Sequence, residues 1–267
     1  MESQNRTVWI VLAVVLIVLC CCVALTGLAA AGLVTSQASN LGPFELPGSC
    51  EERTEWGFEV GDEPALEITN FAGRITIQPG ERDTIHVVAT KKASTRSNLE
   101  RIRISASAPD DGGRVVIKTQ RPPSTGNASV EMVITVPAGT QLDVDTGAGT
   151  VDVGGITGPV AIHSGAGTVN LHGAAGSAQV RLGAGTINYE GSPAGYCSFE
   201  SGAGTINLTL PADLNMEVDV STGAGKVDVA HDVDGRVTKQ SARGTVGDGS
   251  QGTVYAHIGA GDISLTR

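Results

Sequence analysis

A short glycine motif repeats along the second half of the chain and limits the folds that this sequence can adopt. The tripeptide Gly-Ala-Gly occurs six times, and each copy is followed by strand-forming residues in the same order. The copies read GAGTVDV, GAGTVNL, GAGTINY, GAGTINL, GAGKVDV and GAGDISL. A repeat with a period of about 18 residues is typical of architectures in which each copy packs against its neighbours.

Each copy predicts two short strands that are joined by a glycine corner. Leu142 and Val144 precede the first corner, and Val151 and Val153 follow it, so each strand has one apolar side. Glycine suits such a corner because it accepts a positive φ and lets another backbone approach closely. The predicted corner residues are Gly147, Gly149, Gly165, Gly167, Gly183, Gly185, Gly202, Gly204, Gly223, Gly225, Gly259 and Gly261.

A single copy cannot bury its apolar sides, whereas copies that stack at about 4.8 Å bury all of them together. We therefore predict an all-β, β-solenoid-like stack over residues 137–267, in which each copy forms one rung on the copy before it. An antiparallel meander with glycine turns is the alternative. We expect a distorted rung at Ala242-Arg243-Gly244 and an additional rung at Ala72-Gly73-Arg74. Residues 51–136 alternate in the same period-two manner and predict a β region that supplies the first rungs.

Two columns of outward-facing residues are candidates for function. The column three residues beyond the second glycine is expected to form a hydrogen-bonded ladder along the stack, and a polar strip for a ligand is the alternative. It consists of Asp152, Asn170, Asn188, Asn207 and Asp228. The column two residues before each motif is expected to form a charge ladder, and a catalytic site is the alternative. It consists of Asp145, His163, Arg181, Glu200 and Ser221.

The sequence carries no familiar catalytic or cofactor motif. His86, His172, His231 and His257 share no column and no metal-ligand spacing, so we expect surface or loop histidines. The glycine corners do not match phosphate-binding loops, because no helix is expected to follow them. We therefore predict no enzymatic activity, no cofactor and no metal.

A membrane segment is predicted at residues 8–34, which contain no charged residue and exceed the roughly 20 apolar residues that span a bilayer. Residues 1–7 would form a short cytoplasmic stub, because Arg6 precedes the segment and the next basic residue follows far downstream. A cleaved signal peptide is the alternative, since Ala29-Ala30-Ala31 offers a cleavage site. In either case residues 35–50 form a linker and the bulk of the chain is extracytoplasmic.

Charge and cysteine content add two further expectations. The net charge of −10 argues against binding to nucleic acid. Cys50 and Cys197 lie outside the predicted membrane segment, and a disulfide between them is an alternative to a Cys197 thiol packed in the core.

The last predicted strand, Asp262–Thr266, directly follows the last glycine corner. We expect this strand to be uncovered and to promote self-association through the end of the stack.

The repeat G-A-G-T-[VI]-[DN]-[VL], the segment PAGTQLDVDTGAG and the earlier FAGRITI resemble a bacterial family of β-strand-repeat domains of unknown function that is called "putative adhesin". The resemblance covers about residues 65–267 and implies an all-β envelope domain that follows a transmembrane segment. The family defines no functional residues, so none is transferred to this chain.

These observations lead to a hypothesis of a non-enzymatic, single-pass membrane protein whose β-repeats serve adhesion, binding or envelope scaffolding, with an unknown envelope or surface ligand. An accessory role in envelope-stress regulation is the second hypothesis. A polysaccharide-processing β-helix enzyme is the third, and it is disfavoured because such sites need clustered carboxylates and sugar-stacking aromatics. Two of the four aromatic residues of the repeats, among Tyr189, Tyr196, Phe199 and Tyr255, are expected to point inward.

Overall fold

Buried and exposed side chains alternate along nearly every element of the chain, as the period-two sequence pattern predicts. The computed structural model describes residues 50–109, 113–123 and 126–267, and the predicted stub, membrane segment and most of the linker lie outside them. Strands make up most of the described residues, which confirms the all-β class. Among the residues that the structure describes, no helix is long and apolar enough to cross a membrane.

The elements before the repeats are β1 (Cys50–Glu59), β2 (Ala65–Asn70), β3 (Gly73–Pro79), β4 (Thr84–Ala93), α2 (Arg96–Arg101), β5 (Arg103–Ser107), β6 (Arg114–Gln120) and β7 (Ala128–Val136). The repeats contain β8 (Gln141–Gly154), β9 (Val160–Ala174), β10 (Ala178–Gly191), β11 (Gly195–Thr209), β12 (Met216–Ala224), β13 (Val227–Val229), β14 (Asp234–Val237), β15 (Ser241–Val246) and β16 (Gly252–Thr266).

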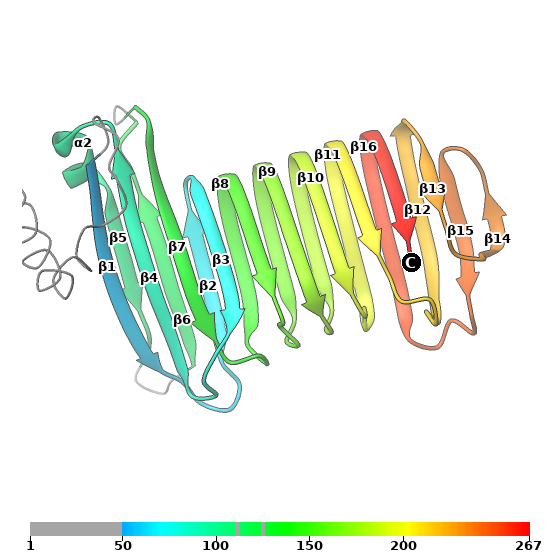
Figure 1. Ribbon diagram of the computed structural model, residues 1–267, viewed down its shortest axis with the longest axis horizontal. Coiled ribbons are helices and arrows are strands. Elements are labelled where there is room, and N and C mark those ends of the chain that lie inside the picture. The colour runs from blue at the N-terminus through cyan, green and yellow to red at the C-terminus, as the bar shows by residue number, and fades with distance from the viewer. Residues whose placement is uncertain (1–49, 110–112, 124–125) are drawn as a thin grey trace, which may run out of the picture. The chain divides into compact units, whose positions relative to one another are not determined.

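The first four copies of the motif stack in parallel and in register. In β8, β9, β10 and β11 the central alanines pair in the order Ala148, Ala166, Ala184 and Ala203, and the residues on both sides of them pair with their equivalents. Figure 1 shows these strands as successive, similarly bent rungs. The parallel pairing is the arrangement expected of stacked copies and differs from the antiparallel meander.

Each repeat strand has two arms, which we define as the residues before and after its Gly-Ala-Gly corner. The first arms continue into β2 and β6, and the second arms continue into β3 and β7. The inward-facing residues of both arms are buried in one hydrophobic core, which contains Leu142, Val144, Val151 and Val153 together with their equivalents in later rungs. The two arms of a rung therefore cover opposite sides of the same core.

The additional rung that the sequence predicts at Ala72-Gly73-Arg74 is present. β2 pairs with the first arm of β8 and β3 pairs with its second arm, so that Gly73 lies opposite Gly149. Gly73 has a φ of 130°, close to the 133° of Gly149. The N-terminal β region thus begins the same stack as the repeats.

The order of the last rungs differs from the order of the sequence. The C-terminal strand β16 lies between β11 and the pair formed by β12 and β13 (Figure 1). β16 is continuous through its corner and pairs with β11 along both arms, whereas the preceding copy is broken into the short β12 and β13. Placing the continuous strand β16 beside β11 therefore lets more backbone groups pair, which explains why β16, and not β12, lies next to β11.

Two predictions about the end of the chain are wrong. The segment Ala242-Arg243-Gly244, predicted to form a distorted rung, lies in β15, and β15 runs antiparallel to β12 and β14 instead of stacking in parallel. The final strand at Asp262–Thr266 is not an uncovered edge, because β16 has neighbours on both sides. The sheet path ends instead at β14, whose four residues are all exposed. Self-association through that end stays a prediction.

The two cysteines outside the predicted membrane segment are not paired. Cys50 begins β1 and Cys197 lies in β11, and both thiols are free, so the disulfide alternative is wrong. Cys197 is completely buried, and burial raises the pKa of its thiol. It acts as a small core residue, as its inward position in the repeat predicts.

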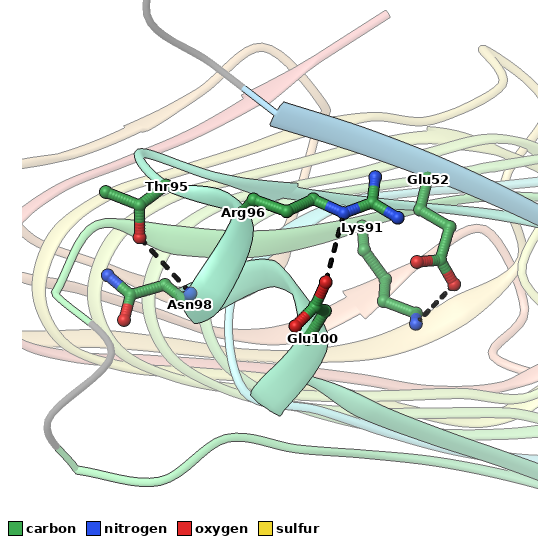
Figure 2. Close-up of polar contacts among 6 residues, drawn as sticks. All are labelled: Glu52, Lys91, Thr95, Arg96, Asn98 and Glu100. Atoms are coloured by element: carbon green, nitrogen blue, oxygen red, sulfur yellow. Dashed lines mark hydrogen bonds and ion pairs between the residues drawn. The ribbon is translucent and has the colours of Figure 1, made fainter.

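A short helix and an ion pair lie close together near the first strand. In α2, the Thr95 side chain accepts a hydrogen bond from the Asn98 backbone nitrogen at 3.2 Å, which is the geometry of a helix N-cap. Lys91 Nζ contacts Glu52 Oε1 at 2.7 Å and joins β4 to β1 (Figure 2). The hydrogen bond from Lys91 holds the pKa of Glu52 below its ordinary value of 4.5.

The stacked corners predict that one added methyl group destabilises the fold. Gly167 has a φ of 133°, and a Cβ on it would overlap the carbonyl oxygen of Gly149. We expect Gly167→Ala to lower the free energy of unfolding by about 3 kcal/mol, measured by denaturant titration. Gly154→Ala is the control, because a Cβ at Gly154 would meet nothing within 4 Å. Equal stability of the two variants would contradict the close packing of the corners.

The Glu52–Lys91 ion pair predicts a pH-dependent contribution to stability. Because the folded-state pKa of Glu52 is lowered, this contribution is present above the unfolded-state value and is lost as the pH falls through the folded-state value. We expect Glu52→Gln to be less stable than the wild-type chain at pH 7, with a difference that shrinks between about pH 5 and about pH 3. Thermal unfolding measures it, and the exposed Glu81→Gln serves as control. A difference that is independent of pH would refute this assignment.

Candidate binding groove

A groove of about 600 Å³ follows the corners of the stack on the outward side of the first arms. Its lining combines the residues two positions before each corner with the corner glycines themselves. Polar and charged side chains therefore border a strip of bare backbone. The principal lining residues are Asp145, His163, Arg181, Glu200, His257, Gly147, Gly165, Gly183 and Gly202.

The stacking of the glycine corners explains why the groove stays open. A Cβ on Gly165 would lie 2.5 Å from the Gly147 carbonyl oxygen, and a Cβ on Gly202 would lie 2.5 Å from that of Gly183. Real Cβ atoms essentially never come this close to backbone atoms, so the floor cannot carry side chains. The same contacts that align the rungs therefore keep the backbone of the groove accessible.

The predicted charge column is present, with one additional member. Asp145, His163, Arg181 and Glu200 occupy equivalent positions in β8, β9, β10 and β11. His257 follows Glu200 in the row and precedes Ser221, because β16 lies between β11 and β12. The expectation that His257 shares no column is therefore wrong. The Gly-Ala-Gly motif two residues after His257 was the signal for its position.

The contacts between neighbouring side chains of the row are exposed to solvent. Arg181 Nε lies 3.7 Å from Glu200 Oε2, and the two side chains are 58% and 39% exposed. His257 Nδ1 and Ser221 Oγ share a hydrogen bond of 3.1 Å. Exposed ion pairs of this kind contribute little to stability. The guanidinium of Arg181 can therefore exchange its contact with Glu200 for a contact with a ligand at small cost.

The predicted amide ladder lies on the second arms and forms the expected hydrogen bonds. Asn170 donates to Asp152 at 2.5 Å, Asn188 donates to Asn170 at 2.8 Å, and Asn207 donates to Asn188 at 2.8 Å. Arg74 Nη1 closes the N-terminal end of the ladder by contacting Asp152 Oδ2 at 2.7 Å. These amides form hydrogen bonds with one another, which favours a structural ladder over a polar strip that binds a ligand.

Asp228 does not adjoin Asn207 as the sequence order predicts. Ser264 of β16 lies between them in the row, and Asp228 pairs with Lys226, whose Nζ is 2.6 Å from its Oδ2. The inserted strand thus ends the run of amides.

The other histidines occupy separate places. His172 is exposed in β9, 3.7 Å from Glu190, and His86 is exposed in β4. His231 lies in the loop after β13 but is buried, with Nε2 3.1 Å from the Pro211 carbonyl oxygen. Within the described ranges 50–109, 113–123 and 126–267, no group of three or more His, Cys, Asp or Glu side chains is arranged to hold a metal ion.

Comparisons with known proteins find similarity only among solved structures. No family model and no curated protein matches the chain. A putative cell adhesion protein from Clostridium sporogenes is 15% identical, with a TM-score of 0.42, over 80% of this chain and 99% of that one. Proteins described as putative adhesins from Parabacteroides distasonis (10% identical, TM-score 0.29) and Bacteroides fragilis (14%, 0.26) each match over 80% of this chain and 97% of theirs. These TM-scores are too low to assign the chain to a family.

The amide ladder predicts a measurable contribution to stability. Asn188 both donates to Asn170 and accepts from Asn207, so Asn188→Ala removes two side-chain hydrogen bonds. We expect a loss of about 1–2 kcal/mol in the free energy of unfolding, measured by denaturant titration. Thr209→Ala is the control, because the Thr209 hydroxyl makes a single exposed hydrogen bond, to Thr266 at 3.2 Å. If Asn188→Ala is no more destabilising than this control, the ladder is not a structural element.

Proposed function

We propose that the protein is a single-pass, extracytoplasmic β-solenoid that binds an envelope or surface ligand without catalysing a reaction and serves adhesion or envelope scaffolding. The observation that carries the proposal is the in-register stacking of the Gly-Ala-Gly corners, which holds the polar row along a backbone-floored groove. Strand spacing of about 4.8 Å fixes successive side chains at regular intervals. An extended, polar ligand that lies along the stack fits such a surface.

The composition of the groove supports binding rather than catalysis. Its acidic and basic side chains come one from each strand and lie on an exposed outer surface. Catalytic sites gain much of their effect from excluding water around the reacting groups. An open row of separate charges is better suited to several weak contacts with a long ligand than to catalysis at a single site.

The sequence before the folded repeats supports an anchored, exported protein. The uncharged segment at 8–34 is long enough to span a bilayer, and the sequence of residues 35–49, which precede β1, has the composition of a spacer. Arg6 favours a cytoplasmic N-terminus.

The location of the folded region is tested by protease accessibility. If the proposal is correct, a protease added outside cells stripped of any outer wall will digest residues 50–267, while the N-terminal segment stays with the membrane. Immunoblotting with antibodies against the two regions measures this, and a cytoplasmic protein serves as the control for lysis. Complete protection of residues 50–267 would refute the extracytoplasmic placement.

The groove is tested by retention of envelope fragments on the full-length protein in lipid nanodiscs. Arg181→Ala is expected to weaken retention of fragments from the source organism by about fivefold, because it removes the central cation of the row. Glu190→Ala is the matched control, since Glu190 is exposed on the second arm and does not line the groove. Retention that is the same for both variants would exclude the groove, and release of a cleaved product would show an enzyme.

A further inference from the structure

Two tyrosines that are far apart in the sequence become neighbours on the outward side of the first arms. Tyr196 in β11 lies opposite Thr253, and Tyr255 in β16 lies opposite Ser198, so the tyrosines are diagonal neighbours on adjacent parallel strands. The buried residues Cys197 and Val254 alternate with them, which places both rings on the outer face. Diagonal positions on paired strands are within reach of aromatic side chains.

These two tyrosines are not explained by core packing. Tyr189 and Phe199 are the aromatic pair of the repeat core, with ring centroids 5.0 Å apart and both side chains fully buried. Tyr196, by contrast, is 52% exposed, and Tyr255 is half-buried. A large aromatic surface that is left in water beside a second ring is typical of an interaction site.

Hydrogen-bonding groups surround the two rings. Ser198, Tyr255, Asp219 and Arg243 form one row across β11, β16, β12 and β15. Arg243 Nη2 contacts Asp219 Oδ2 at 2.6 Å, and Ser198 donates to Glu200 Oε1 at 3.2 Å. Burial, followed by the nearby Glu200 and Asp219 carboxylates, raises the pKa of Tyr255, so its phenol stays a hydrogen-bond donor.

This arrangement matches the chemistry of a sugar ring. A pyranose presents a face of C–H groups that packs on an aromatic ring, and its hydroxyl groups donate hydrogen bonds to carboxylates at its edge. Each of the two carboxylates is already paired with a guanidinium, Asp219 with Arg243 at 2.6 Å and Glu200 with Arg181 at 3.7 Å. An uncharged sugar can therefore bind without disturbing these ion pairs, whereas an anionic polymer would have to compete with the two carboxylates for their guanidinium partners.

We infer that Tyr196 and Tyr255, with Glu200 and Asp219, form a binding site for an uncharged oligosaccharide at the end of the groove. Glu200 borders both the tyrosine pair and the groove, so a longer chain of sugars can continue from the rings along the stack. The inference rests on the proposed binding role and specifies the chemistry of the ligand. Tyr196 supplies the exposed stacking face, and Tyr255 supplies a second face and a donor.

The test titrates the full-length protein in lipid nanodiscs, which avoid sugar-based detergents, with three tetrasaccharides. Cellotetraose and tetra-N-acetylchitotetraose are uncharged, and tetragalacturonate carries carboxylates. We expect calorimetric binding of at least one uncharged probe and at least about tenfold weaker binding of tetragalacturonate. Binding of neither uncharged probe, or preference for the anionic one, would overturn the inference. The two uncharged probes distinguish plain hexose chains from N-acetylated ones.

Variants assign the binding to the tyrosines. Tyr196→Ala is expected to weaken binding by about tenfold, whereas Tyr196→Phe keeps the stacking face and retains most of it. Val237→Ala, which alters an exposed residue of β14, is the control and should bind as the wild-type chain does. If Tyr196→Ala does not fold, loss of binding in a Tyr255→Ala variant with retained binding in Tyr255→Phe gives the same assignment. Unchanged binding in both alanine variants would refute it.

The outcome is separable from that of the proposed function. If envelope fragments are retained in an Arg181-dependent manner but no tetrasaccharide binds, the groove has a ligand of another chemistry and only the present inference fails. If tetrasaccharides bind at the tyrosines but Arg181→Ala retains envelope fragments normally, the tyrosine site stands and the groove assignment fails.

Discussion

Backbone contact between stacked glycine corners is the constraint on which the rest of the structure depends. At each corner a glycine with positive φ lies directly against the backbone of the equivalent glycine in the neighbouring rung, with no room for a Cβ between them. This contact fixes the alignment of the rungs, because a shift by one residue would place a side chain where only backbone fits. Alignment in turn sends every second residue of both arms into the core.

The alignment also organises the outer surface of the stack. Residues at equivalent positions of successive rungs form continuous rows, and the residue types in each row determine its chemical properties. The second arms carry amides that bond to one another and are used for stability. The first arms carry unlike charges, a bare backbone floor and two outward tyrosines, which leave hydrogen-bonding groups and aromatic surface exposed. The same alignment thus produces one side on which amides bond to one another and another side on which we propose that a ligand binds.

Much of the local structure could be predicted because it follows from short-range patterns. The alternation around Leu142, Val144 and Val151, and the glycine corners, predict strands, corners and inward residues that the structure contains. The order of the rungs could not be predicted from the repeat alone, because all copies offer nearly the same edge to a neighbour. The exchange of β16 and β12 depends on which copy forms the longer continuous pairing with β11.

The sequence by itself determined the all-β class, the period of the rungs, the corner glycines and the rows on either arm. Only the tertiary structure decided that His257 lies between Glu200 and Ser221 in the charged row, that Ser264 separates Asn207 from Asp228, and that Tyr196 lies beside Tyr255. The physical reason is the range of the interactions. Side-chain alternation and glycine φ are properties of a few consecutive residues, whereas the partner of a strand is chosen by competition among distant edges for backbone hydrogen bonds.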